Sequence, residues 1–350
     1  MQIHKNYNLS KLNTFGISVN AKFFVEIHNE TDVKELFKME EFSARGGSAF
    51  GEKKLFLGGG SNVLFTKDFD GLVILNKLKG IEILNEDLES VTIRCMGGEI
   101  WHDLVTFSVK RGLWGIENLA LIPGTVGAAP MQNIGAYGAE LQNVLQNVEA
   151  FDLTTGEKRI FKREECKLGY RDSIFKNELK DKYFITAVIL TLSKLENKNI
   201  TYKILEEYLK KNEIEIKGPK DISDAVAAIR KNKLPDPAII PNAGSFFKNV
   251  FIGKEELRKL QKNFPQIPYF EEDGMVKVPA GWLIEHCGPR DGTSWRGYRL
   301  GNVGVHEKQA LVLVNYGGAT GEEISLFADK IISDVKEKFG LKLVPEVNLI

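Results

Sequence analysis

Two glycine-rich stretches constrain the fold of this 350-residue chain more than any other feature of its sequence. The first, G-G-G-S-N at 58–62, follows the apolar run K-L-F-L and leads into a second apolar run, V-L-F. The second, at 121–140, overlaps a segment, 113–138, that we expect to be a long irregular connection. Consecutive backbone N–H groups in such turns form concave sites for phosphate oxygens. Two loops of this kind can hold a dinucleotide, although a plain strand turn is an equal alternative for the first.

The first stretch does not have the spacing of two common nucleotide-binding folds. In the dinucleotide motif G-x-G-x-x-G, the glycines open a helix, whereas residues 63–65 here (V-L-F) are apolar and prone to form a strand. The sequence also contains no G-x-x-x-x-G-K-[ST]. Neither an ordinary Rossmann domain nor a P-loop is therefore indicated.

The spacing of apolar residues predicts an α+β chain with a β-α-β unit near its N-terminus. That unit combines a capped helix at 31–39 with the strand–glycine–strand run at 54–65. The further predicted strands are 72–76, 81–84, 91–95, 148–153, 184–192 and 310–315, and the further predicted helices are 100–112, 221–231, 253–263, 280–287 and 320–338.

Composition and charge exclude several classes of protein. Lys plus Arg and Asp plus Glu balance at 47 each, so no overall field attracts nucleic acid or an anionic membrane. No apolar stretch reaches eighteen residues, so the sequence predicts no membrane-spanning helix. The cysteines, Cys95, Cys166 and Cys287, have no metal-binding spacing and are expected to fill the core of a cytoplasmic protein. We expect no metal site.

The segment N-A-G-S-F-F-K-N at 242–249 contains the most reactive candidate side chain. Ser245 follows a glycine, which accepts unusual backbone angles, and precedes two phenylalanines that can exclude water. A serine held in this way could donate a proton. By itself, the motif favours a turn serine that bonds nearby backbone.

Taken together, the motifs resemble the UDP-N-acetylenolpyruvoylglucosamine reductase family, in its longer type with a tyrosine loop. The matching blocks extend over nearly the whole chain. They are N-T-F-G (13–16), G-G-G-S-N-V-L (58–64), the run from E-N-L-A to G-A-E (117–140), G-Y-R-D-S-I-F-K (169–176), K-L-P-D-P (233–237), N-A-G-S-F-F-K-N (242–249), A-G-W-L-I-E (280–285), H-E-K-Q-A-L-V-L-V-N (306–315) and P-E-V (345–347).

This resemblance implies a fold and an activity. The fold would be a two-part FAD-binding region of the vanillyl-alcohol oxidase type plus a separate α+β substrate domain. We expect FAD-binding subdomains at 1–76 and 77–234 and a substrate domain at 235–334, with 335–350 returning to the first subdomain. The activity would be reduction of UDP-N-acetylglucosamine enolpyruvate to UDP-N-acetylmuramate, a peptidoglycan precursor. Non-covalent FAD and NADPH would supply the electrons, and the protein would be a monomer.

The family's site residues carry over by motif. Flavin N5 would deliver hydride to the enol ether, with Ser245 as proton donor, and Arg171 and Glu346 would complete the catalytic set. A raised pKa would allow Glu346 to lie near the substrate carboxylate. The cofactor-binding positions would be Gly58, Gly60, Ser61, Asn62, Pro123, Gly124, Gly127, Ile134 and Gly135, and the substrate-binding positions would be Tyr170, Tyr202, Lys233, Asn249 and Gln309.

Two other functions remain open at this stage. An alcohol or lactone oxidase with the same FAD fold would share the glycine loops but would not need Ser245, Arg171 and Glu346 together. A non-catalytic protein that binds nucleotide sugars would leave the catalytic set unexplained. Out of context, Arg171 and Glu346 would be surface charges, and Tyr202 keeps a plain packing role as an alternative.

Overall fold

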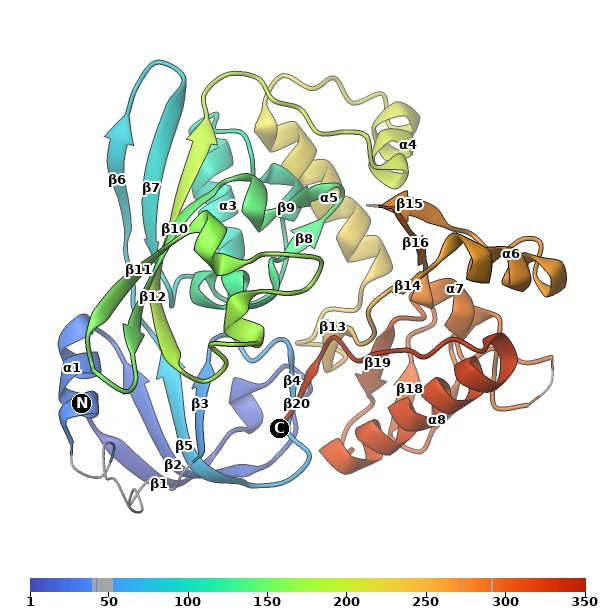
Figure 1. Ribbon diagram of the computed structural model, residues 1–350, viewed down its shortest axis with the longest axis horizontal. Helices are drawn as coiled ribbons and strands as arrows, with labels where there is room; N and C mark the ends of the chain where they lie inside the picture. Colours follow the sequence, from blue (N-terminus) through green and yellow to red (C-terminus); the bar gives the residue numbers. More distant parts are fainter. Residues whose placement is uncertain (40–41, 43–52, 273, 291) are drawn as a thin grey trace. The chain divides into compact units, whose positions relative to one another are not determined.

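The computed structural model describes residues 1–39, 42, 53–272, 274–290 and 292–350 (Figure 1). The chain divides into two compact units. Unit 1 comprises residues 1–8, 20–60 and 69–232, and unit 2 comprises residues 9–19, 61–68 and 233–350. The chain passes from unit 1 to unit 2 between Gly60 and Ser61, inside the first glycine stretch. The predicted boundaries at residues 76, 234 and 334 stay a prediction.

Unit 1 contains four α-helices, two larger sheets and the two-stranded sheet of β8 (Gly135–Ala136) and β9 (Ala139–Glu140) among its described residues. The first sheet has the order β1-β2-β5-β3, and β2, β5 and β3 are parallel. Its elements are β1 (Ile3–Asn8), β2 (Asn20–Ile27), α1 (Glu30–Lys38), β3 (Lys53–Leu57) and β5 (Phe69–Asn76). The predicted β-α-β unit is confirmed: α1 connects β2 to β3, and β5 lies between the two strands. A complete capping box at Asn29 and Asp32 begins α1.

The second sheet of unit 1 is antiparallel, with the order β11-β10-β12-β7-β6. Its strands are β6 (Ile81–Glu86), β7 (Ser90–Met96), β10 (Leu145–Asp152), β11 (Lys158–Lys162) and β12 (Tyr183–Ser193). The unit's other helices are α3 (Trp101–Lys110), α4 (Lys203–Lys211) and α5 (Pro219–Lys233), whose last residue already belongs to unit 2. Apolar residues of α3 and α5 belong to the same core as those of β7 and β12, and Figure 1 shows α3 beside this sheet. A second core joins Phe151 and Phe184 to β2, β5 and α1.

Unit 2 is built around a four-stranded sheet with the order β13-β19-β18-β17. The strands of the whole unit are β4 (Val63–Leu64), β13 (Asn242–Ser245), β14 (Val250–Ile252), β15 (Phe270–Glu272), β16 (Met275–Val278), β17 (Arg299–Leu300), β18 (Val303–Val305), β19 (Val312–Asn315) and β20 (Asn348–Leu349). Its helices are α6 (Lys254–Asn263), α7 (Ala280–Glu285) and α8 (Gly321–Phe339). A capping box at Thr320 begins α8, and Gly340, with φ of 72°, ends it.

The three cysteines are buried and unpaired, as the sequence predicted for core residues. Burial raises the pKa of each thiol, that of Cys95, Cys166 and Cys287 alike, to about 12. Within the part of the chain that the structure describes, no helix is long and apolar enough to cross a membrane.

Candidate active site

Ser245 ends β13 at an irregularity of the sheet. The register of β13 against β19 shifts between Asn242 and Ser245, and Gly244 takes a positive φ of 69° within this bulge. The side-chain oxygen of Asn242 accepts a hydrogen bond from the Gly244 backbone N–H at 2.9 Å. A side chain at position 244 would be strained in this conformation, so the glycine of N-A-G-S is required by the backbone that presents Ser245.

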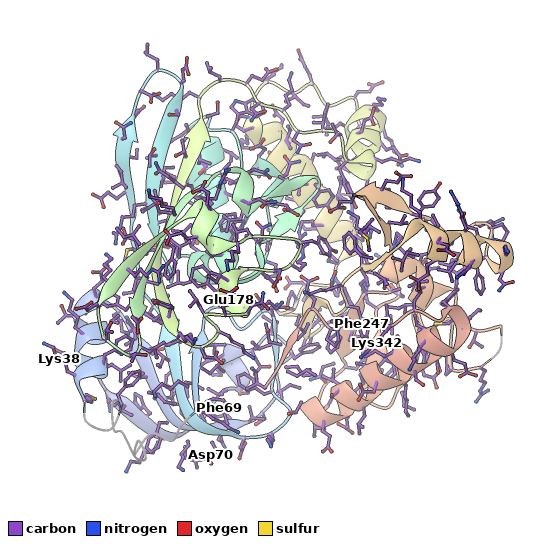
Figure 2. All side chains as sticks on the ribbon, viewed as in Figure 1. Lys38, Phe69, Asp70, Glu178, Phe247 and Lys342 are labelled. Atoms are coloured by element: carbon purple, nitrogen blue, oxygen red, sulfur yellow. The ribbon has the colours of Figure 1, made fainter. Side chains whose placement is uncertain are left out.

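The surroundings of Ser245 differ from those of an ordinary turn serine. Its hydroxyl makes no hydrogen bond to any described residue, so it does not bond nearby backbone as the alternative interpretation required. The next two residues, Phe246 and Phe247, are each only 1% exposed, and Figure 2 labels the second of them. The hydroxyl is therefore available, beside a pair of buried rings.

The C-terminal segment brings Glu346 next to this serine. Its backbone N–H donates a hydrogen bond of 2.7 Å to the carbonyl of Phe246, the residue after Ser245. The backbone N–H of Lys248 donates a hydrogen bond of 2.9 Å to the carbonyl of Val344, so the C-terminal segment runs alongside residues 246–248. Two of the three predicted catalytic residues, Ser245 and Glu346, thus lie on adjoining backbone within unit 2.

The same segment ties Asn62 of the first glycine stretch to Glu346. The Asn62 side chain donates to the Glu346 carbonyl at 3.3 Å, and its own carbonyl accepts from the Asn348 side chain at 2.9 Å. Beyond this point β20 pairs with β4. Ser61 and Asn62 are partly exposed there and belong to unit 2.

The predicted substrate-binding residues of unit 2 gather at two places. The Asn249 side-chain oxygen accepts from the Ala280 N–H at 3.1 Å, at the first residue of α7. Gln309 lies at the same end of α7, since a Cβ on Gly281 would be 3.7 Å from its Oε1. Lys233 is the last residue of α5 and is partly exposed.

In unit 1, the two glycine-rich stretches lie against each other. A Cβ built on Gly58 would be 2.4 Å from Oγ1 of Thr125, and one built on Gly59 would be 2.9 Å from the Cα of Gly124. Gly127 approaches the backbone of Gly97 in the same way, at 3.0 Å. Side chains at Gly58 or Gly59 would force the two loops apart.

Several polar atoms around these loops are buried and unpartnered among the described residues. They include Oγ1 of Thr125 and Oδ1 of Asn118. Because a buried polar atom without a partner costs free energy, such atoms are suited to a hydrogen bond with a polar ligand or with water. Sequence reasoning missed Thr125, and its place between two glycines in P-G-T-V-G was the available signal.

Arg171 lies on a strained turn beside the second loop. Its φ is 53°, in the left-handed region that a residue with a side chain rarely adopts. One of its terminal nitrogens donates to the carbonyl of Gly135 at 2.7 Å, and its guanidinium carbon lies 5.3 Å from the centre of the Tyr170 ring. Ser173 fastens the turn to the loop by donating to the Met131 carbonyl at 2.7 Å. The structure thus brings Arg171 and Tyr170 to the predicted cofactor-binding residues Ile134 and Gly135.

Tyr202, the predicted loop tyrosine, precedes α4. It is 44% exposed, and its ring meets that of Tyr137 edge to face at 5.4 Å between centroids. Asn118 links the segments around Tyr137 and Asn199. Its side-chain nitrogen donates hydrogen bonds to the backbone carbonyls of both residues, each at 2.8 Å. Tyr137 therefore contacts a predicted site residue, and the sequence analysis did not single it out although it stands in the matched block G-A-Y-G.

His102, on α3, supports the second loop. Its Nδ1 accepts a hydrogen bond of 3.1 Å from the N–H of Leu121, which has a positive φ of 56°. Burial is the main cause that lowers the pKa of His102 below its ordinary value. Lys231 and Arg230 act in the same direction, and Asp103 opposes them. The neutral ring is thus the form that the folded protein favours.

We expect acid to weaken this support. The pKa of His102 is lower in the folded protein than in the unfolded chain. The stability that His102 contributes is therefore present at a pH above the pKa of the unfolded chain, and it is lost as the pH falls below that pKa. The variant His102→Gln, which keeps an acceptor, should therefore lose less thermal stability than the wild type between pH 7.5 and pH 5.5. Thermal unfolding at both pH values measures this. His28→Gln, at an exposed position, is the control, and equal losses for all three proteins would contradict the prediction.

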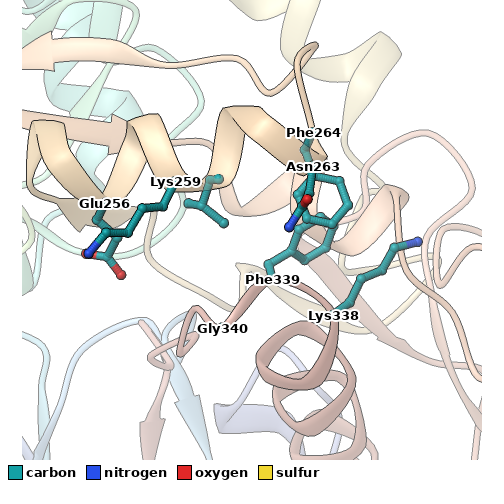
Figure 3. A pocket seen from close by; sticks show the side chains of 8 residues that line it. Glu256, Lys259, Asn263, Phe264, Lys338, Phe339 and Gly340 are labelled. Carbon is teal, nitrogen blue, oxygen red and sulfur yellow. The ribbon is translucent and has the colours of Figure 1, made fainter.

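A shallow pocket in unit 2 contains none of these residues. Figure 3 shows it between α6 and the end of α8, where the rings of Phe264 and Phe339 lie 4.7 Å apart between centroids. Its other named side chains, Glu256, Lys259, Asn263 and Lys338, are polar. Among the described residues, no group of three or more His, Cys, Asp and Glu side chains could hold a metal ion.

Comparisons with known proteins identify the families that the chain matches. Residues 21–161 match the FAD binding domain family, and residues 236–350 match the C-terminal domain of UDP-N-acetylenolpyruvoylglucosamine reductase. The chain is 45% identical to the UDP-N-acetylenolpyruvoylglucosamine reductase of Flavobacterium johnsoniae over all of both chains. It is 42% identical to that of Pseudomonas aeruginosa, with 100% of this chain and 99% of the other covered.

Solved structures share the fold. The reductase MurB from Thermus caldophilus superposes with a TM-score of 0.63 at 21% identity, over 100% of this chain and 99% of the other. A solvent-stable cholesterol oxidase superposes with a TM-score of 0.50 at 12% identity, over 99% and 86% of the two chains.

Fold and site together define an FAD-containing oxidoreductase of α+β architecture, with an FAD-binding region of the vanillyl-alcohol oxidase type and a second domain. The buried polar atoms and the close glycine loops fit that cofactor. The chain belongs to the UDP-N-acetylenolpyruvoylglucosamine reductase family, which works in peptidoglycan synthesis.

Proposed function

We propose that this protein reduces UDP-N-acetylglucosamine enolpyruvate to UDP-N-acetylmuramate, with NADPH as the reductant and non-covalent FAD as the cofactor. The observation that carries the proposal is the unbonded hydroxyl of Ser245 beside the backbone of Glu346. An oxidase needs no such proton donor. Full-length similarity to reductases of this name supports the same substrate.

The proposed roles of the residues follow from where charge develops. FAD, held by the predicted cofactor-binding residues, would supply hydride chemistry at the β-carbon of the enol ether, with NADPH as the source of the electrons. Negative charge then grows on the α-carbon and its carboxylate. Ser245 donates its hydroxyl proton to the α-carbon, and proximity compensates for the weak acidity of an alcohol. Arg171 stabilises the carboxylate with its planar fork of N–H donors, and Glu346 completes the catalytic set.

The remaining predicted residues hold the ligands in this proposal. The cofactor-binding set contains Gly58, Gly60, Ser61, Asn62, Pro123, Gly124, Gly127, Ile134 and Gly135. The substrate-binding set contains Tyr170, Tyr202, Lys233, Asn249 and Gln309. The enzyme acts as a cytoplasmic monomer, and its three unpaired thiols suit a reducing compartment.

Anaerobic spectroscopy tests the proposed function. The holoenzyme is reduced with NADPH without oxygen, the enolpyruvyl sugar nucleotide is added, and the flavin absorbance is followed. We expect NADPH to bleach the flavin and the substrate to restore its absorbance with formation of UDP-N-acetylmuramate. Flavin that stays reduced until oxygen is admitted would reject the reductase and favour the oxidase.

A further inference from the structure

Asn133, in the second glycine-rich stretch, has no role in the function proposed so far. It follows the short 3₁₀-helix Val126–Gln132 and has a φ of 44° and a ψ of 65°. Asparagine tolerates this left-handed conformation better than most residues with a side chain. The residue is 0% exposed. A polar side chain that is fully buried has to satisfy its hydrogen-bonding groups inside the protein, so its partners indicate what it does.

Both ends of the Asn133 side chain make hydrogen bonds. Its Oδ1 accepts from the backbone N–H of Gln142 at 3.0 Å. Its Nδ2 donates to Oε2 of Glu140 at 2.8 Å and to the carbonyl of Gly169 at 3.2 Å. The first two partners are close in sequence, whereas Gly169 begins the distant turn that carries Arg171. Asn133 therefore joins the second glycine-rich loop to that turn.

The carbonyl of Gly169 closes this turn. The backbone groups of Gly169 and Asp172 exchange two hydrogen bonds, of 3.1 and 3.2 Å, so Tyr170 and Arg171 form the tip between them. The Gly169 carbonyl thus accepts from the Asp172 N–H and from the Asn133 side chain at once. The φ of Arg171, 53°, is strained, and a strained backbone persists only where its surroundings hold it in place. Asn133 supplies such a hold on the turn.

We propose that Asn133 is a positioning residue for Arg171. By holding the carbonyl of Gly169, it fixes the turn, and the turn fixes where the guanidinium of Arg171 meets the carboxylate of the substrate. The inference rests on the proposed function, because Asn133 affects the reaction only through Arg171. A displacement of about 1 Å that originates away from the reacting atoms can slow an enzyme by about 10²-fold. Loss of the bond to Gly169 should therefore be visible in the rate.

The test removes the bond to Gly169 and keeps the other bonds of the side chain. Asn133→Asp retains the shape, the tolerance of a left-handed backbone and an acceptor for the Gln142 N–H, but it loses both bonds of Nδ2. In Asn133→Asp/Glu140→Gln, the new amide at 140 can donate to the new carboxylate at 133, so the bond between these positions returns in the opposite direction. Only the bond to Gly169 is then absent. Glu140→Gln alone is the matched control, because its amide oxygen still accepts from Asn133.

Anaerobic stopped-flow absorbance of the holoenzyme measures the two half-reactions. We expect Asn133→Asp/Glu140→Gln to reoxidise its flavin with the enolpyruvyl substrate about 10- to 100-fold more slowly than Glu140→Gln, with reduction by NADPH nearly unchanged. Added to Arg171→Met, the same pair of substitutions should slow reoxidation by less than about twofold more, because a positioning residue has no effect once the residue that it positions is absent. A merely structural role would slow both half-reactions and would add to the defect of Arg171→Met.

Hydrogen exchange of the holoenzyme, followed by mass spectrometry, gives a readout that does not depend on the reaction. The amides of residues 169–172 should exchange faster in Asn133→Asp/Glu140→Gln than in Glu140→Gln. Unchanged exchange, or a full additional loss in the Arg171→Met background, would overturn the inference.

A third variant covers a failure of the aspartate variants to retain flavin. Asn133→Gly accepts the left-handed backbone and buries no charge, so the same measurements on it then decide the question. A failure of the proposed function gives a different result. Wild-type flavin that stays reduced after the substrate is added would reject the reductase, while hydrogen exchange would still decide whether Asn133 holds the turn.

Discussion

The variant Ser245→Ala should reoxidise its flavin with the enolpyruvyl substrate about 10²- to 10⁴-fold more slowly than the wild type, the usual contribution of a positioned proton donor. Reduction of the flavin by NADPH should continue at nearly the wild-type rate, because that step needs no proton from Ser245. Anaerobic stopped-flow absorbance measures the two half-reactions separately.

Ser245→Cys is the matched control for this prediction. A thiol retains a transferable proton at the same position, so this variant should recover part of the lost rate, whereas alanine cannot. Retention of FAD by both variants would show that the fold is intact. Equal slowing of the NADPH half-reaction in Ser245→Ala would instead indicate a general distortion of the site, and proton donation by Ser245 would then be rejected.

The sequence predicted the parts of this site that depend on local chemistry. Gly244 in N-A-G-S indicated an unusual backbone angle before Ser245, and the structure shows one, a φ of 69°, but in a bulge of strand β13 and not in a tight turn. The helices and strands with clear apolar spacing, such as α8 and β12, were also predicted within a few residues. In each case, neighbouring residues contain the signal, because capping, glycine backbone angles and apolar periodicity act over short distances in the chain.

What the sequence could not predict depends on contacts between distant residues. β20 has only two residues, and it forms a strand because β4, 285 positions earlier, supplies its hydrogen bonds. The amphipathic helix α4 was also not predicted. It follows a polar segment whose strand and turn signals are weak. Arg230 reads as one of several basic residues in A-I-R-K-N-K, and only the packing of α5 distinguishes it from Lys231.

The close approach of the two glycine-rich loops predicts a large loss of FAD affinity when a methyl group is added between them. The variant Gly58→Ala should bind FAD roughly 10- to 100-fold more weakly, the range expected when an extra methyl group is forced into a packed site. The new Cβ would lie 2.4 Å from Oγ1 of Thr125, so one of the two loops has to move. Titration of the apoprotein with FAD, followed by flavin fluorescence, gives the affinity.

A second substitution identifies the cause of this loss. In Gly58→Ala/Thr125→Ala the clashing oxygen is absent, and the nearest remaining atom, Cβ of Ala128, lies 3.4 Å away at an ordinary contact distance. The double variant should therefore bind FAD more tightly than Gly58→Ala alone, and Thr125→Ala alone should show the smaller defect of a lost hydroxyl. Gly218→Ala, at a glycine with open space around it, controls for the change to alanine itself. If the double variant binds no better than Gly58→Ala, the contact between the loops does not determine FAD affinity.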